Sequence, residues 1–225
     1  LSRSLQSISS VVPSGRTMPI LLNFLMELKG EDLTVTASDL ETTITVKLNP
    51  GMVEQGSINR IAIPAKMFLE VVNSLSTQQI TIEVQEDFSV EITAGTGKYK
   101  LVGEDPESYP VAMELEEPVL TTMSSSILVK AIGKTIFATG NSELRPQMSG
   151  VLCEQTESGT TFVATDAHKL VKYTRTDCKC DEPRSFILPK TPLGLLNKLL
   201  SSYKEEMDVK MENNKENVRF TFENY

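Results

Sequence analysis

The pattern of apolar and polar residues along the chain predicts many short strands and a few amphipathic helices. Apolar or β-branched residues alternate with polar ones in five segments, as in strands with one buried face. These segments are residues 33–39, 42–48, 78–84, 88–94 and 98–103. The sequence GTGK at residues 95–98 lies between two of them and opens no helix, so it predicts a hairpin turn, not a phosphate-binding loop.

Helical periodicity is found in three segments, residues 64–75, 124–140 and 189–200. The first has Pro64 at a first-turn position, and the second begins with serines and ends at Gly140. Strands in this number, with so few helices, predict an α+β fold. We expect antiparallel sheets with helices on one face.

The chain repeats itself. Residues 19–39 align with residues 146–166 without a gap, and Asp39 then meets Asp166. Further along, residues 63–75 align with residues 188–200. We expect two homologous domains, residues 1–115 and 116–225, each with a helix, three strands, a helix and two or three strands. The acidic, Pro-containing segment 104–118 is the predicted linker, and such a repeat suits an arc or ring.

Composition narrows the possibilities. A hydrophobic content of 40% with 23% charged residues is typical of a soluble globular protein. Three cysteines favour a reducing compartment. The net charge of −8 argues against a uniform coat on nucleic acid but is compatible with one basic surface. A start at Leu1 and a stop inside a strand-like run lead us to expect a fragment.

The sequence VATDAHKLV, residues 163–171, contains the only histidine, His168, two residues after Asp166. One interpretation is a hydrolase, metal-dependent or acid/base, that uses these two residues. However, no signature of a nucleophile accompanies them. In the first copy of the repeat, Asp39 is followed by Glu41 where the second copy has His168. The aspartate is therefore better explained as a turn residue that caps its own backbone.

A metal site is a second alternative, with Cys178, Cys180 and His168 as ligands beside Asp177 and Asp181. The spacing is CxC and not the CxxC of structural zinc sites, which favours a polar loop between strands. Cys153, in a strand-like segment, is predicted to be a small buried apolar residue.

Several basic residues fall on the predicted helices. They contact the phosphates of a nucleic acid by charge if the helices line one surface. An ordinary solvated helix face is the alternative, which composition alone favours. These residues are Arg3, Lys66, Lys130, Lys134, Lys190 and Lys198.

Seven segments in order along the chain resemble the bacterial sliding clamp, the beta subunit of DNA polymerase III. They are RTMPILLNFLMEL, LTVTASDLET, IPAKMFLEVVNSL, ESYP, MSGVLCE, VATDAHKLV and ILPKTPLGLLNKLL. The resemblance implies a cytoplasmic processivity factor with no catalytic site, cofactor or metal. Three domains per subunit and two subunits would close into a ring around duplex DNA, with helices lining the hole. This chain would cover the first domain and most of the second, and the third would be absent.

The resemblance also implies a pocket in which the polymerase III alpha subunit, the clamp loader and other clamp-binding proteins dock a short peptide. Its residues here are Arg145, Met148, Thr165, Ala167, His168, Lys169 and Leu170. Ala167 stands where the family usually has Gly, and Lys169 where it usually has Arg, which weakens planar contacts.

For DNA contact, the resemblance adds Arg16 and supports Lys66 and Lys190. For ring closure, it implies that an edge strand pairs with the third domain of a second subunit. The residues of that strand are Tyr99, Lys100, Leu101 and Val102.

Overall fold

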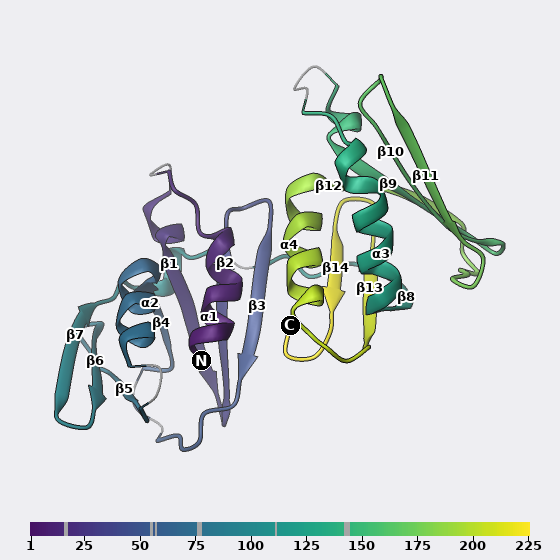
Figure 1. Cartoon of the computed structure of the whole chain (residues 1–225). Coiled ribbons are helices and arrows are strands. Elements are labelled where there is room, and N and C mark those ends of the chain that lie inside the picture. The colour runs from purple at the N-terminus through teal and green to yellow at the C-terminus, as the bar shows by residue number, and fades with distance from the viewer. Residues whose placement is uncertain (16–17, 55, 57, 76–77, 111, 142–144) are drawn as a thin grey trace. The chain divides into compact units, whose positions relative to one another are not determined.

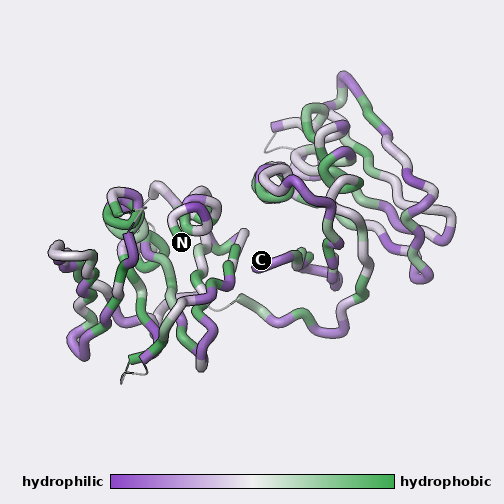
Figure 2. Tube along the Cα trace, turned by 60° about the horizontal axis from the view of Figure 1, so that its bottom comes forward, coloured by the Kyte–Doolittle hydropathy of each residue, from purple (hydrophilic) through white to green (hydrophobic). Residues whose placement is uncertain are grey.

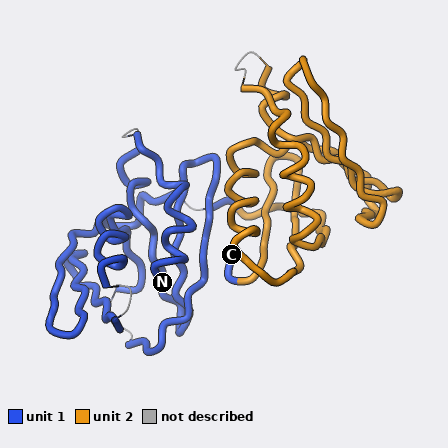
Figure 3. Tube along the Cα trace, viewed as in Figure 1, with its two compact units in different colours: residues 1–113, 224–225 blue, residues 114–223 orange. Residues whose placement is uncertain are grey.

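The computed structural model describes residues 1–15, 18–54, 56, 58–75, 78–110, 112–141 and 145–225. The chain divides into two compact units, shown in Figure 3. Unit 1 comprises residues 1–113 with 224–225, and unit 2 comprises residues 114–223. The boundary between domains at 115/116 stays a proposal.

The described residues of unit 1 form two α-helices, three short 3-10 helices and two antiparallel sheets (Figure 1). The first sheet has the order β3-β2-β1-β4 and the second the order β5-β6-β7. The α-helices are α1 (Ser2–Ile8) and α2 (Ala65–Ser74). The strands are β1 (Asn23–Lys29), β2 (Asp32–Ser38), β3 (Thr43–Leu48), β4 (Arg60–Pro64), β5 (Thr81–Val84), β6 (Ser89–Ala94) and β7 (Gly97–Val102).

Unit 2 repeats this plan, with sheets of the order β11-β10-β9-β12 and β14-β13-β8. Its helices are α3 (Ser125–Thr135), the 3-10 turns η4 (Ile136–Ala138) and η5 (Pro146–Met148), and α4 (Lys190–Ser201). Its strands are β8 (Val119–Ser124), β9 (Gly150–Thr156), β10 (Gly159–Thr165), β11 (Leu170–Arg175), β12 (Arg184–Pro189), β13 (Asp208–Asn213) and β14 (Val218–Thr221).

The repeat found in the sequence is confirmed by the elements. The starts of β1, β2 and β3 align with those of β9, β10 and β11 at one constant offset, and the start of α2 aligns with that of α4. In each unit two helices pack against each other and against the first sheet: α1 on β2 and β3, α2 on β1 and β4, α3 on β10 and β11, α4 on β12. The α+β class, with antiparallel sheets and a helical layer, is therefore confirmed.

The core of each unit lies between its helices and sheets. Phe24 and Phe68 in unit 1, and Leu128 and Phe162 in unit 2, are at most 2% exposed. Figure 2 shows apolar and polar residues alternating along the strands, which is the pattern that a sheet with one covered face requires.

Three elements differ from the prediction, one helix and two strands. The predicted helix at 124–140 ends as an α-helix at Thr135, whose Oγ1 donates to the carbonyl oxygen of Ala131 at 2.7 Å, and continues as the tighter η4. The sequence pattern does not reveal strands β4 and β12, since each runs directly into a helix. Pro64 and Pro189 each end a strand and occupy the N-cap of the following helix.

The predicted linker at 104–118 needs a correction, because its first part belongs to the core of unit 1. Tyr109 is 2% exposed and packs with Ile20, Leu21 and Ala62. Its hydroxyl donates to the carbonyl oxygens of Asn23 (3.3 Å) and Thr36 (3.4 Å). Burial raises the pKa of Tyr109 to about 12.

Candidate partner-binding hairpin and basic helix surfaces

The turn between β10 and β11 is built by the Asp166 carboxylate and the Thr165 hydroxyl. Oδ1 of Asp166 accepts hydrogen bonds from the backbone N–H groups of His168 (3.0 Å) and Lys169 (2.9 Å). Thr165 Oγ1 accepts from the N–H of Ala167 at 3.2 Å and donates to the carbonyl oxygen of Lys169 at 2.8 Å. Such side-chain-to-backbone bonds fix a tight turn without help from the tip residues.

The same turn recurs between β2 and β3. Oδ1 of Asp39 accepts from the N–H groups of Glu41 (3.0 Å) and Thr42 (2.6 Å), and Ser38 Oγ accepts from that of Leu40 (3.2 Å). The turn of unit 1 carries no histidine. The interpretation of Asp166 as a turn-capping residue is therefore confirmed.

The Asp166 carboxylate is also paired with a cation. Its Oδ2 accepts from Nζ of Lys169. This bond and the two backbone N–H bonds hold the pKa of Asp166 well below its usual range. The Asp166 carboxylate is therefore held ionised, and its oxygens are already used in hydrogen bonds within the turn. Within the described residues no hydrogen bond joins its carboxylate to the imidazole, so the arrangement does not favour a hydrolytic pair.

Ala167 lies at the tip with φ of 75°, and its counterpart Leu40 has φ of 79°. This left-handed region is strained for residues with a Cβ and is readily adopted by glycine. Ala167, where the family usually has Gly, therefore adopts the turn conformation at the cost of backbone strain.

Met148, one of the predicted pocket residues, lies beside this turn. Its carbonyl oxygen accepts from the N–H of Gly140 at 2.7 Å. A Cβ at Gly140 would be 3.6 Å from Met148 Cβ and 3.7 Å from Asp166 Cα, so Gly140 lies between the two. The Leu170 side chain is 66% exposed. Ala167, His168, Lys169 and Arg145 are also exposed. These side chains are accessible to a partner, and peptide binding stays a prediction.

The described α-helices are net positive in a chain that is acidic overall, because they contain almost no acidic residues. The four α-helices of the described structure contain six of the 22 Lys and Arg residues and one of the 30 Asp and Glu residues, Glu70. Of the predicted DNA contacts, five are exposed: Arg3, Lys66, Lys130, Lys134 and Lys198. Arg16 lies outside the described residues.

Lys66 and Lys190 fall in the first turns of α2 and α4. A cation in the first turn of a helix interacts unfavourably with the helix dipole. The position of these two lysines is therefore not explained by the helix itself, and an anionic partner would explain it. Lys190 has a second role that the sequence did not indicate: its Nζ donates to Oδ1 of Asn141 at 2.9 Å and ties α4 to the loop before η5.

The predicted subunit interface lies on β7, an edge strand bonded on one side to β6. Val102 is 73% exposed and Tyr99 37% exposed, and Lys100 is also exposed. Leu101 is 4% exposed, so only its backbone is available to a partner strand, and the interface stays a prediction. The alternation of the strand turns Leu101 into the core of unit 1.

The three cysteines are buried thiols. Cys153 is 0% exposed in β9, as predicted, and burial raises its pKa to about 12. Cys178 and Cys180 lie in the loop between β11 and β12, where the Cys180 thiol donates to the Glu182 carbonyl oxygen at 3.2 Å. In the part of the chain that the structure describes, no group of three or more His, Cys, Asp or Glu residues is placed to hold a metal ion. None of its helices has the length and apolarity that crossing a membrane requires.

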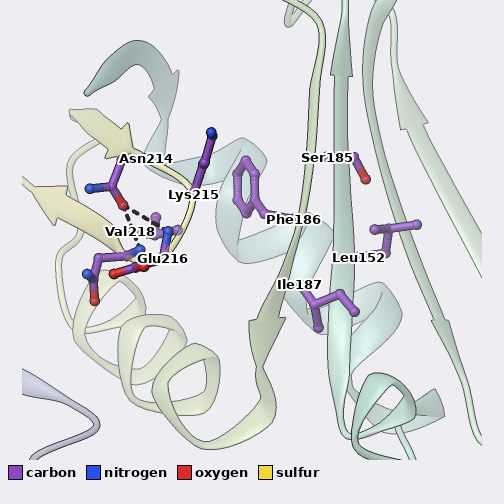
Figure 4. A pocket seen from close by; sticks show the side chains of 9 residues that line it. Leu152, Ser185, Phe186, Ile187, Asn214, Lys215, Glu216 and Val218 are labelled. Carbon is purple, nitrogen blue, oxygen red and sulfur yellow. Dashed lines mark hydrogen bonds between the residues drawn. The ribbon is translucent and has the colours of Figure 1, made fainter. Parts of the chain in front are cut away.

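Unit 2 also has a cleft of about 420 Å³ that the sequence pattern does not indicate (Figure 4). It lies between the β12 edge, at Phe186 and Ile187, and the turn after β13, where Asn214 Oδ1 accepts from two backbone N–H groups. In unit 1 the corresponding edge of β4 is covered, since Ala62 and Glu104 exchange backbone hydrogen bonds of 3.2 and 2.8 Å.

Comparison with protein families decides the relationship. Residues 1–114 match the model of the DNA polymerase III beta subunit N-terminal domain, and residues 122–225 match that of its central domain. The chain belongs to the DNA polymerase III beta subunit family. The resemblance seen in the sequence is confirmed, and no finding supports the alternative hydrolase.

The relatives of this beta-subunit chain are longer. It is 32% identical over 215 residues to the beta sliding clamp of Halalkalibacterium halodurans, a match that covers 92% of this chain and 57% of the relative. A sliding clamp structure from Bacillus subtilis is 26% identical, with a TM-score of 0.83 over 100% of this chain and 63% of that one. A putative beta subunit from Eubacterium rectale, 24% identical with a TM-score of 0.90 over 99% and 60%, shares the fold. The chain spans somewhat more than half the length of the curated relatives.

Proposed function

We propose that this chain supplies the first and central domains of a DNA sliding clamp. The complete protein would be a cytoplasmic processivity factor without catalysis of its own, closed as a homodimer around duplex DNA. Membership of the beta subunit family supports this proposal. The observation that carries it is the segregation of charge, with six cations and one acid on the four described helices of an acidic chain.

The helical cations would hold DNA without reading its sequence. Lysines on helix surfaces neutralise phosphates, which gives affinity that falls steeply with salt and does not depend on the bases. A protein that must slide needs this kind of contact.

Duplex binding at several salt concentrations tests the proposal. A variant with Lys66, Lys130, Lys134 and Lys198 changed to Gln should flatten the slope of log K against log salt, by up to roughly 0.9 for each phosphate that is no longer neutralised. The matched control has the same charge change at exposed lysines outside the helices, namely Lys172, Lys179, Lys210 and Lys215. Equal slopes for the two variants would contradict the proposal.

We also propose that the turn of residues 165–170, with Met148 and Arg145, docks a short peptide of the polymerase alpha subunit, the clamp loader or other clamp-binding proteins. The exposed Leu170 side chain supports this, because it offers a partner an apolar contact beside the exposed polar groups of the turn. A QL-rich peptide should bind more weakly to Leu170→Ala and Thr165→Val. Leu40→Ala, at the tip of the turn in unit 1, is the control and should bind normally.

Ring closure would use the free edge of β7. Tyr99, Lys100 and Val102 would flank the backbone that pairs with a strand of a second subunit. Cross-linking or sedimentation of the longer protein with Val102→Asp should give monomers, and a dimer of unchanged stability would refute this interface.

A further inference from the structure

One face of α3 and η4 combines two lysines with an exposed aromatic ring. Between Lys130 and Ala138 the exposed residues are Lys130, Gly133, Lys134 and Phe137. Their spacing of three, four and seven residues places them on one side of the helix. Phe137 is 60% exposed, an unusual position for a ring of this size.

Phe137 is not needed by the core of unit 2. Its neighbours fill that role: Ala138 is 0% exposed, and the Ile136 side chain faces α4, 3.9 Å from where a Cβ of Gly194 would lie. The ring is thus available to a partner from outside the chain.

The helices around the ring carry only positive charge, and the acidic group near them is Glu206, which accepts hydrogen bonds from Ser124 and Ser126 at the start of α3 and interacts with Lys130. Neither α3 nor α4 contains an acidic residue. Gly133 has no atom within 4 Å of the place its Cβ would occupy, so no internal contact requires this poor helix former. Its missing side chain leaves open backbone between Lys130 and Phe137, where a partner can approach closely.

Charge and shape together match a single strand of nucleic acid. Resting on the proposed contact of these helices with DNA, we infer that Phe137 stacks on an unpaired base while Lys130 and Lys134 contact the adjoining phosphates. Every base presents a flat π face, and an aromatic ring beside cations binds single strands with little sequence preference. In a duplex these faces are covered by neighbouring bases, so Phe137 contributes only where the strands are separated.

A tryptophan in place of Phe137 gives a direct signal, because the chain contains no tryptophan. In Phe137→Trp, an oligo-dT long enough to span the face should quench the indole fluorescence by stacking on it. A duplex of equal length should bind but leave most of the indole fluorescence unquenched. Equal quenching by both, or none by the single strand, would overturn the inference.

Affinity supplies the second readout. Phe137→Leu should weaken oligo-dT binding by roughly fivefold to a hundredfold, the range for loss of one stacked base, and leave duplex affinity within about twofold. Phe137→Tyr should restore the binding. Leu120→Ala, which changes a 56% exposed residue on β8, is the control and should bind as the unchanged chain does.

The outcomes separate this inference from the proposed function. If the helical lysine variant loses duplex binding but Phe137→Leu binds oligo-dT normally, the stacking role is wrong and the clamp proposal stands. If the lysine variant retains its salt slope, the clamp surface itself is refuted. If Phe137→Trp is quenched by a QL-rich peptide, or by raising the protein concentration, in place of oligo-dT, the occupant is a peptide or a second copy and the inference fails.

Discussion

Asp39 and Asp166, at equivalent places in the two copies of the repeat, each accept two backbone hydrogen bonds from the third and fourth residues of their own turns. Only the second has a lysine paired with its other oxygen. The two turns therefore have the same backbone bonding, and the turn at Asp39 is a natural control for variants of the turn at Asp166.

The first prediction concerns acid stability. Because Asp166 has a folded-state pKa below its unfolded value, its contribution is present above about pH 4 and is lost as the pH falls further. We expect the urea midpoint of the unchanged chain to fall more steeply between pH 5 and 3 than that of Asp166→Asn. Lys169→Met, which removes the largest cause of the shift, should give an intermediate slope. Identical slopes in all three proteins would show that protonation of Asp166 does not contribute to the loss of stability in acid.

The second prediction concerns backbone strain at the tip. Replacing Ala167 (φ 75°) by Gly should stabilise the chain by about 1 kcal/mol, because the left-handed conformation costs Ala more than it costs Gly. Leu40→Gly, at φ 79°, should act in the same direction. Ala112→Gly, at an exposed residue without positive φ, is the control and should be neutral or slightly destabilising. Urea unfolding followed by circular dichroism measures all three.

The third prediction concerns Tyr109. Its folded pKa of about 12 exceeds the unfolded value near 10, so its stabilising contribution is complete below pH 10 and declines toward pH 12. Tyr109→Phe should lose about 1 kcal/mol near pH 8, because it removes the proton that the hydroxyl shares between two carbonyl oxygens. The difference between the two proteins should shrink as the pH rises. A constant difference would mean that the hydroxyl does not titrate in the folded state.

The fourth prediction separates the two neighbours on β7. Leu101→Ala should destabilise unit 1 by about 2–5 kcal/mol, as expected for a buried leucine. Val102→Ala, at a 73% exposed position, should change stability by less than about 0.5 kcal/mol. The reverse order in urea unfolding would mean that the outward face of β7 had been misassigned.

Local pattern is enough to find the repeat and most elements. The alignment of the two copies rests on residues such as Asp39 and Asp166 that keep one conformation in both, and alternation locates β2, β3, β6 and β7 to within a residue or two. Strand β4 is missed because Pro64 closes it and opens α2 with no loop between, so helical periodicity hides a short strand.

Contacts between distant residues are beyond the reach of local pattern. Tyr109 sits among acidic residues and prolines typical of a linker, and only its packing with Ile20 and Leu21 places it in the core. The exposure of Phe137 depends on Ile136 and Ala138 taking the inward positions after α3 tightens into η4. The residues of the peptide pocket are assigned from the family resemblance, because the sequence of a turn does not indicate which molecule binds to it.

The construction of the paired turns has an evolutionary consequence. The bonds that hold each turn come from the aspartate, the preceding hydroxyl residue and the main chain, so the side chains at the tip have no part in them. After a duplication, the third position of the turn can therefore diverge without loss of these hydrogen bonds. Glu41 and His168, side chains of different chemical character, occupy that position in the two copies. A new binding specificity can therefore arise at this hairpin without a change in its backbone conformation.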